Sequence, residues 1–314
     1  MAGFSTKRDG VLYLTEGGQE TEIMYKFGHE LPEFAMYPLL EDPAAMSDLK
    51  GMYKRVLDAA AAHGFAAMLT GLDYRASPDW GAKLGYSREG LADALMQSIA
   101  FLRDVARPYV GQIPEIIYGG MAGPRGDAYS LNKTVTADEA EDYHAFQIEI
   151  VKRAGVDFMS AVTFNNVPEA VGVARAAASV GLPLYISFTL DSNHRLKSGL
   201  SLKEAIESVD AEAGDAKPDF YGLNCSHPLE FEPALEPGDW IKRLRCLRPN
   251  ASAKDKIALC KIGHLEDGDP VDLGARMGEL ARRYPHIDVW GGCCGTWDRH
   301  LNEIARNVRL ARSY

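Results

Sequence analysis

The chain has 314 residues, 46% hydrophobic and 25% charged, which is enough to bury a large core. Its net charge of −10 argues against a nucleic acid or an anionic membrane surface as a partner. Five cysteines, an odd number, and no apolar leader in residues 1–10 favour a reducing compartment, and no stretch is long and apolar enough to span a membrane. We therefore expect a cytoplasmic protein that acts on small molecules, and an oligomer is compatible with these features.

In the first half of the chain, short apolar runs alternate with helix-like segments. The helices have clear start and stop signals: Asp42-Pro43 and Ser87 are typical of helix starts, Thr136 begins a capping box, and Gly64 is a typical stop. The expected strands are 11–15, 65–70, 116–118 and 156–162, and the expected helices are 43–63, one starting at 87, and 136–154.

The second half continues the alternation. Ser201 begins a second capping box, and Gly181 ends a helix rich in small residues. The expected strands are 184–188, 221–224, 257–262 and 287–290, and the expected helices are 167–180, one starting at 201, 235–247, 271–284 and a last one through residues 301–310.

Eight strands that alternate with eight helices, without a break in composition, indicate a (β/α)8 barrel. We therefore predict an α/β fold in which one TIM barrel domain covers residues 1–314. A doubly wound open sheet is the alternative, but no glycine-rich dinucleotide fingerprint follows the first strand.

Two adjacent cysteines lie in the stretch Gly291-Gly292-Cys293-Cys294-Gly295-Thr296, where the eighth strand turns into the last helix. Glycines and small thiols are poor core material, but they permit a sharp turn. Cys225 follows the sixth strand in a similar turn. Because strand ends meet at one mouth of a barrel, we expect Cys225, Cys293 and Cys294 to converge. Three thiolates with a free fourth position are typical of a catalytic zinc site.

Three other interpretations of these cysteines stay open. They could be inert buried thiols, or Cys293 and Cys294 could form a strained vicinal disulfide. A structural zinc site would need a fourth protein ligand. Cys246 and Cys260 are the remaining cysteines, and we interpret both as packing residues, in an expected helix and an expected strand respectively.

Several motifs resemble the zinc-dependent homocysteine S-methyltransferase family, which includes enzymes that use betaine or S-methylmethionine. The matching segments run nearly from end to end and include Glu16-Gly17-Gly18-x-x-Thr21-Glu22, Tyr74-x-Ala76-Ser77, Ala82-Lys83-Leu84-Gly85-Tyr86, Gly123-Pro124, Ile186-Ser187-Phe188-Thr189-Leu190, Gly222-x-Asn224-Cys225 and the Cys293-Cys294 stretch.

This resemblance implies a zinc-dependent S-methyltransferase of methionine biosynthesis, in which Cys225, Cys293 and Cys294 hold Zn²⁺ and form the catalytic centre. A methyl group would pass from a small sulfonium or quaternary-ammonium donor to a zinc-bound thiol, with homocysteine as the leading acceptor. Aromatic faces suit such a donor, and Tyr74, Trp290 and Trp297 lie near the predicted mouth. The expected substrate-binding residues are Glu16, Gly17, Gly18, Asp73, Tyr74, Arg75, Thr163 and Asn224.

The chain departs from the family at positions that bear on the acceptor. Glu16 stands where the family usually has aspartate, and Val162 stands where a glutamate usually helps to hold the homocysteine ammonium. Arg75 could bind a carboxylate or phosphate, or pair with Asp73 or Glu16. A different thiol acceptor and a zinc- or thiol-binding barrel without turnover therefore remain as alternatives.

Overall fold

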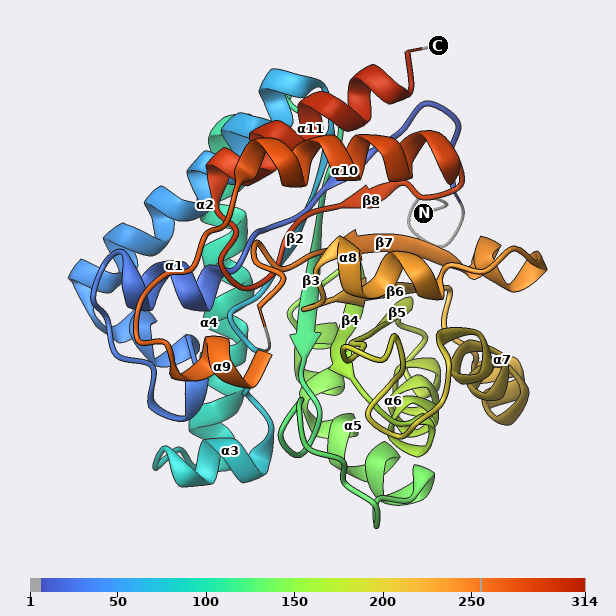
Figure 1. Cartoon of the computed structure of the whole chain (residues 1–314). Helices are drawn as coiled ribbons and strands as arrows, with labels where there is room; N and C mark the ends of the chain where they lie inside the picture. Colours follow the sequence, from blue (N-terminus) through green and yellow to red (C-terminus); the bar gives the residue numbers. More distant parts are fainter. Residues whose placement is uncertain (1–6, 255, 314) are drawn as a thin grey trace.

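The computed structural model describes residues 7–254 and 256–313, and the side chains of 256, 257 and 260 lie outside that description. Eight parallel strands close into a barrel, with β8 paired to β1 (Figure 1). This closure confirms the predicted (β/α)8 barrel and excludes the open sheet. The strands are β1 (Tyr13–Leu14), β2 (Ala66–Thr70), β3 (Ile116–Ala122), β4 (Phe158–Phe164), β5 (Leu184–Phe188), β6 (Phe220–Asn224), β7 (Leu244–Arg248) and β8 (Val289–Trp290).

The helices form where the capping signals lie. Thr136 and Ser201 make complete capping boxes, and Gly64 ends its helix in the left-handed conformation at φ 67°. The α-helices are α1 (Gln19–Tyr25), α2 (Pro43–His63), α3 (Pro78–Lys83), α4 (Arg88–Ala106), α5 (Ala137–Arg153), α6 (Val167–Ser179), α7 (Leu202–Ala213), α8 (Pro228–Phe231), α9 (Lys256–Lys261), α10 (Pro270–Arg283) and α11 (Asp298–Ala311).

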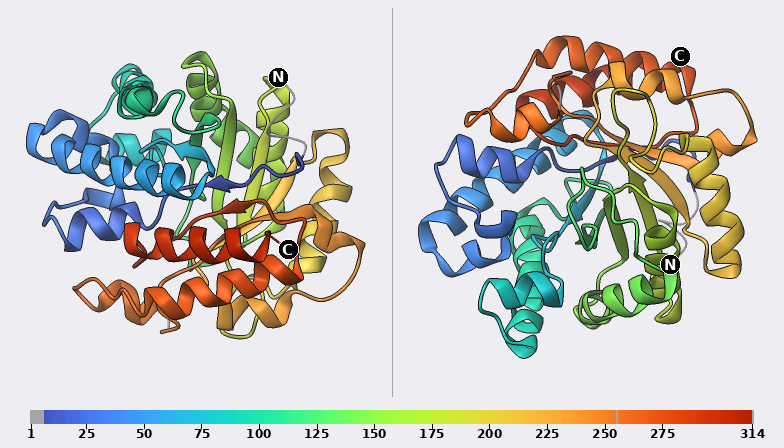
Figure 2. Two further views of the ribbon diagram at one scale, coloured as in Figure 1. Left: turned by 90° about the horizontal axis from the view of Figure 1, so that it is seen from above. Right: turned by 60° about the horizontal axis from the view of Figure 1, so that its bottom comes forward.

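The helices surround the strands, as the two views of Figure 2 show. Helix α11 packs between α10 and α2 and so closes the ring of helices. Buried apolar residues form a large cluster that includes the contacts between strands and helices and a smaller cluster that includes Phe158, Tyr185 and Phe220. Among the described residues, we find no helix with the length and apolarity needed to cross a bilayer.

The predicted seventh strand and the helix before it were wrong. Residues 257–262, expected to be a strand, lie largely in α9, and the true β7 (Leu244–Arg248) occupies the end of the segment expected to be a helix. The strand was not recognised because it contains two arginines, Arg245 and Arg248, and charged residues are rare in a buried strand. Arg245 is accommodated by a register shift between β6 and β7, and it pairs with Asp288 at 2.7 Å.

The same error affected the two spare cysteines. Cys246 is fully buried, as expected of a packing residue, but in a strand and not in a helix. Cys260 lies in α9 and not in a strand, and the predicted packing of its side chain falls outside the described residues. The sequence analysis also missed the short helices α1, α3 and α8, of which α1 follows the Glu16-Gly17-Gly18 motif directly.

Candidate active site

A cavity of about 490 Å³ contains all three cysteines of the predicted metal site in its lining. Residues from the ends of β4, β6 and β7 and from the turn after β8 contribute to it, as expected for the carboxyl end of a barrel. Of the predicted substrate-binding residues, the lining includes Gly17, Tyr74, Arg75, Thr163 and Asn224, and it does not include Glu16, Gly18 and Asp73.

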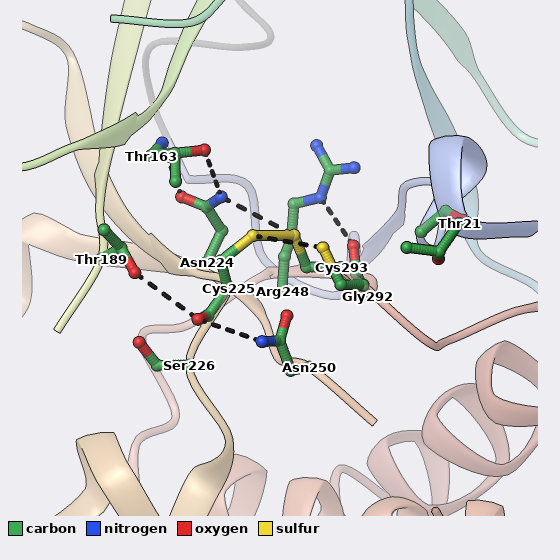
Figure 3. The surroundings of a disulfide bond; sticks show 12 residues. Thr21, Thr163, Thr189, Asn224, Cys225, Ser226, Arg248, Asn250, Gly292 and Cys293 are labelled. Atoms are coloured by element: carbon green, nitrogen blue, oxygen red, sulfur yellow. Dashed lines mark hydrogen bonds between the residues drawn. A yellow bond between two sulfur atoms is a disulfide. The ribbon is translucent and has the colours of Figure 1, made fainter. Parts of the chain in front are cut away.

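The three sulfur atoms lie within 4.8 Å of one another. Cys225 and Cys293 are joined as a disulfide, with their Cα atoms 5.4 Å apart (Figure 3). The Sγ of Cys294 lies 3.9 Å from that of Cys225. The disulfide considered from the sequence, between the adjacent Cys293 and Cys294, is not the one formed. A bond between Cys225 and Cys293 was not expected from the sequence.

Cys225 is held in an unusual backbone conformation directly after β6. Its φ is +53°, a region that non-glycine residues seldom adopt. Neighbouring strand ends hold it there: its N–H donates to the carbonyl of Arg248 at 3.3 Å, and its carbonyl accepts from Asn250 Nδ2 at 3.2 Å. These two hydrogen bonds therefore hold the backbone of Cys225 in this conformation.

The turn that carries Cys293 and Cys294 is packed closely against the start of α1. Gly18 N–H donates to the carbonyl of Thr296 at 2.9 Å, and Thr296 Oγ1 donates to the carbonyl of Cys293 at 2.7 Å. A Cβ on Gly18 would lie 2.5 Å from that Cys293 carbonyl oxygen, so only glycine fits without a shift. Gly18 thus shapes the site although it does not line the cavity.

Asn224 links β4 to the sulfur atoms. Its Oδ1 accepts from the N–H of Thr163 at 2.9 Å, and its Nδ2 donates to Thr163 Oγ1 at 3.0 Å and to Cys293 Sγ at 3.8 Å (Figure 3). Thr163 has φ +66°, a genuine outlier for a β-branched residue. An N–H directed at a sulfur stabilises its thiolate form.

Glu16 does not line the cavity, and its side chain is fully buried. Its carboxylate accepts from Thr70 N–H at 2.5 Å, Thr70 Oγ1 at 3.0 Å and Thr15 Oγ1 at 2.5 Å. Its ionic partner is Arg248, at 3.7 Å, and not Arg75. The Glu16 carboxylate therefore belongs to a network of hydrogen bonds and one ion pair inside the barrel.

Arg248, at the end of β7, is a cavity residue that the sequence analysis missed. Its side chain is 6% exposed, and its Nε donates to the carbonyl of Gly292 at 3.1 Å. Burial lowers the pKa of Arg248, but Tyr185 and Glu16 outweigh this and raise it above its ordinary value. A correct assignment of β7 would have placed this arginine at the mouth.

Asp73 and Arg75 follow β2 but have separate environments. Burial raises the pKa of Asp73 to about 7, and its Oδ2 accepts from Met121 N–H at 3.0 Å behind the cavity wall. Arg75 lines the cavity, and its guanidinium lies 4.3 Å from the ring centre of Trp80. Arg75 forms no ion pair with a described residue, so the expected alternative pairing with Asp73 or Glu16 is not present.

Comparison with known proteins shows which family this chain resembles. The sequence model of the family described as homocysteine S-methyltransferase matches residues 13–308. Homocysteine S-methyltransferase 4 of Zea mays is 24% identical over 275 residues, covering 78% of this chain and 76% of the relative. Homocysteine S-methyltransferase 1 of Arabidopsis thaliana is 24% identical over 201 residues, covering 59% and 56%.

Solved structures agree on the fold. The oxidised form of the homocysteine methyltransferase MmuM from Escherichia coli superimposes with a TM-score of 0.72 at 19% identity, and its metallated form with 0.69 at 18% identity, each covering 96% of both chains. These structural matches confirm the predicted barrel, and the family model and the curated relatives confirm the predicted class of thiol S-methyltransferase. Because the family model spans nearly the whole sequence, the chain belongs to the homocysteine S-methyltransferase family.

Proposed function

We propose that this protein transfers a methyl group from a small cationic donor to the thiol of homocysteine or a close relative, with Zn²⁺ held by Cys225, Cys293 and Cys294. The observation that carries the proposal is the convergence of these three sulfur atoms, within 4.8 Å of one another, in one cavity. Each sulfur comes from the end of a strand or the turn after it, where barrel enzymes place their chemistry.

The three cysteine sulfurs are suitable ligands for zinc. Tetrahedral coordination with Zn–S bonds of about 2.3 Å separates ligand sulfurs by about 3.8 Å, close to the 3.9 Å between Cys225 and Cys294. A cysteine binds zinc as its thiolate, so the disulfide between Cys225 and Cys293 has to be reduced before zinc can bind. Three protein ligands leave one position for an acceptor, and zinc, when bound, supplies the Lewis acidity that keeps a thiol ionised near neutral pH.

The chain's own residues orient the reaction. Asn224 directs an N–H at Cys293, and Thr163 fixes the amide of Asn224. Of the aromatic residues expected near the mouth, Tyr74 lines the cavity, and Phe34 packs edge-on against it with ring centres 6.5 Å apart. Such faces suit a sulfonium or quaternary ammonium group.

The two tryptophans expected near the donor are occupied elsewhere. Trp290 is fully buried in the large core cluster, and Trp297 is not part of the cavity lining. The ammonium of Lys26 lies 3.0 Å from the centre of the Trp297 ring. The donor cation is therefore assigned to the Tyr74 side of the cavity.

The proposed transfer balances in charge and atoms. The acceptor thiolate forms a bond to the methyl carbon while the bond from that carbon to the donor's sulfur or nitrogen breaks. The donor leaves as a neutral thioether or tertiary amine with the bonding electron pair, and the acceptor becomes a thioether. A cavity that excludes water strengthens the attraction between the anionic and cationic reactants.

The test is a panel of thiols and methyl donors offered to purified, reduced, zinc-loaded protein. Mass spectrometry of the methylated thiol measures transfer, with S-methylmethionine and betaine as donors. We expect transfer to homocysteine with one donor class, no transfer in Cys294→Ser, and unchanged transfer in the control Cys246→Ala. Binding of thiols without any transfer would contradict the proposal and support the barrel without turnover.

A further inference from the structure

Glu20, an acidic residue of the cavity lining, has no role in the reaction proposed above. Glu20, the second residue of α1, is partly buried and lines the same cavity as the three cysteines. The neighbouring acids differ from it: Glu16 does not line the cavity and pairs with Arg248, and Glu22 pairs with Arg55 at 2.8 Å outside the lining.

Glu20 has no ionic partner of its own among the described residues. Burial raises the pKa of the Glu20 carboxyl above its ordinary value, and its own backbone and the charges of Arg248 and Arg75 offset this only in part. Arg248 forms its ion pair with Glu16, and Arg75 donates to the carbonyl of Gly126 at 3.0 Å. A cation that enters the cavity would therefore find the Glu20 carboxylate available.

The position of Glu20 is fixed relative to the cysteines. The residues on either side of it bond to the turn after β8: Gly18 N–H donates to the carbonyl of Thr296 at 2.9 Å, and Thr21 Oγ1 accepts from Gly295 N–H at 3.0 Å. Both bonds anchor the first turn of α1 to the Cys293-Cys294 loop, so the segment that carries Glu20 is held against that loop.

Two other residues of the cavity lining are weaker candidates for binding a cation. Val162, in β4, lines the cavity with an apolar side chain and cannot hold a cation by charge. Asp127 is the other carboxylate among the described lining residues, but it is exposed, and its Oδ1 accepts from Tyr129 N–H at 2.7 Å. Glu20 is the less exposed of the two.

We propose that Glu20 binds the ammonium group of the acceptor and so selects α-amino-acid thiols over thiols without an amino group. The inference rests on the proposed function, since it concerns the acceptor of that reaction. It assigns recognition of the ammonium to α1, on the wall of the cavity formed by the segment after β1, and not to β4, where Val162 stands.

The experiment compares homocysteine with 4-mercaptobutanoate, the same thiol without the amino group. Binding to zinc-loaded protein is measured by calorimetry without a donor, and kcat/KM is measured with one. A charge-assisted hydrogen bond predicts that the wild type prefers homocysteine by about tenfold or more in both measurements. Glu20→Gln should reduce the preference to near one by weakening homocysteine alone, and Glu20→Asp should retain part of it.

The matched control is Asp127→Asn, which removes the rim carboxylate and keeps its Oδ1 acceptor, and it should leave the preference intact. Zinc content and thermal unfolding of each variant show that the site and the fold persist. A wild-type ratio near one, or an equal loss for both thiols in Glu20→Gln, would overturn the inference. A preference in binding that depends on Glu20, without methyl transfer, would uphold the role of Glu20 and refute the proposed function.

Discussion

The buried ion pair between Arg248 and Glu16 gives a quantitative prediction about stability. Arg248→Met keeps a long apolar side chain but removes the charge that faces Glu16. The two side chains are 6% and 0% exposed, and their charged atoms are 3.7 Å apart. With an effective dielectric constant of about 20, their attraction is about 4 kcal/mol, and breaking a buried pair typically costs about 3–5 kcal/mol.

The cost should fall near the lower end of that range. The Glu16 carboxylate keeps its bonds from Thr70 and Thr15, which continue to stabilise its charge after Arg248 is replaced. We therefore expect Arg248→Met to lower the free energy of unfolding by about 3 kcal/mol, which corresponds to about 4–5 °C in melting temperature for a chain of this length.

The assay is equilibrium urea unfolding of Arg248→Met, Glu16→Gln and the double variant. Because Glu16→Gln removes the charge that Arg248→Met leaves unpaired, the double variant should be more stable than Arg248→Met alone, with a coupling of about 2 kcal/mol. A cost below about 1 kcal/mol for Arg248→Met, or single effects that add within about 0.5 kcal/mol, would refute the reasoning.

Three further predictions follow from individual residues. Gly18→Ala should cost about 1–3 kcal/mol and weaken zinc binding, since the added Cβ would lie 2.5 Å from the Cys293 carbonyl oxygen; unchanged zinc affinity and melting temperature would contradict this. Cys246→Ala should lose about 1 kcal/mol through a small cavity and keep full activity, and a stable, zinc-loaded but inactive variant would show that Cys246 does more than pack. The pKa of Asp73 is about 7 in the fold against 3.8 ordinarily, so the folded state retains this proton while the unfolded state loses it, and stability falls as the pH rises from 4 to 7. Urea unfolding at several pH values should show that stability falls by a few kcal/mol less in Asp73→Asn than in the wild type. Parallel pH profiles of the two proteins would contradict this.

The parts of the fold that the sequence predicted depend on local chemistry. Asp42, Ser87, Thr136 and Ser201 accept hydrogen bonds from the first turns of their helices, and such caps are visible in the sequence because one residue type and its spacing suffice. The seventh strand was missed because its two arginines can be buried only when acidic partners from distant parts of the sequence pair with them. Asp288 and Glu16, which neutralise them, come from other parts of the chain.

The candidate site was likewise predictable where it depends on the local sequence, and not where it depends on contacts between distant segments. Glycines around Cys293 and Cys294, and the strand end before Cys225, were sufficient to predict that the three sulfurs converge. The direction of Glu16 was not predictable, because it depends on Thr70 in β2 and Arg248 in β7, which meet only after the barrel closes. Glu20 was missed because the short helix α1 was not recognised, although its place near the glycine motif was a usable signal.

The claim that Cys225, Cys293 and Cys294 form one metal site is tested most directly by the zinc content of reduced protein in competition with a chelator. We expect about one zinc per chain in the wild type, much weaker retention in Cys294→Ser, and the same far-ultraviolet circular dichroism for both. A Cys294→Ser protein that retains one zinc per chain with wild-type affinity would contradict it.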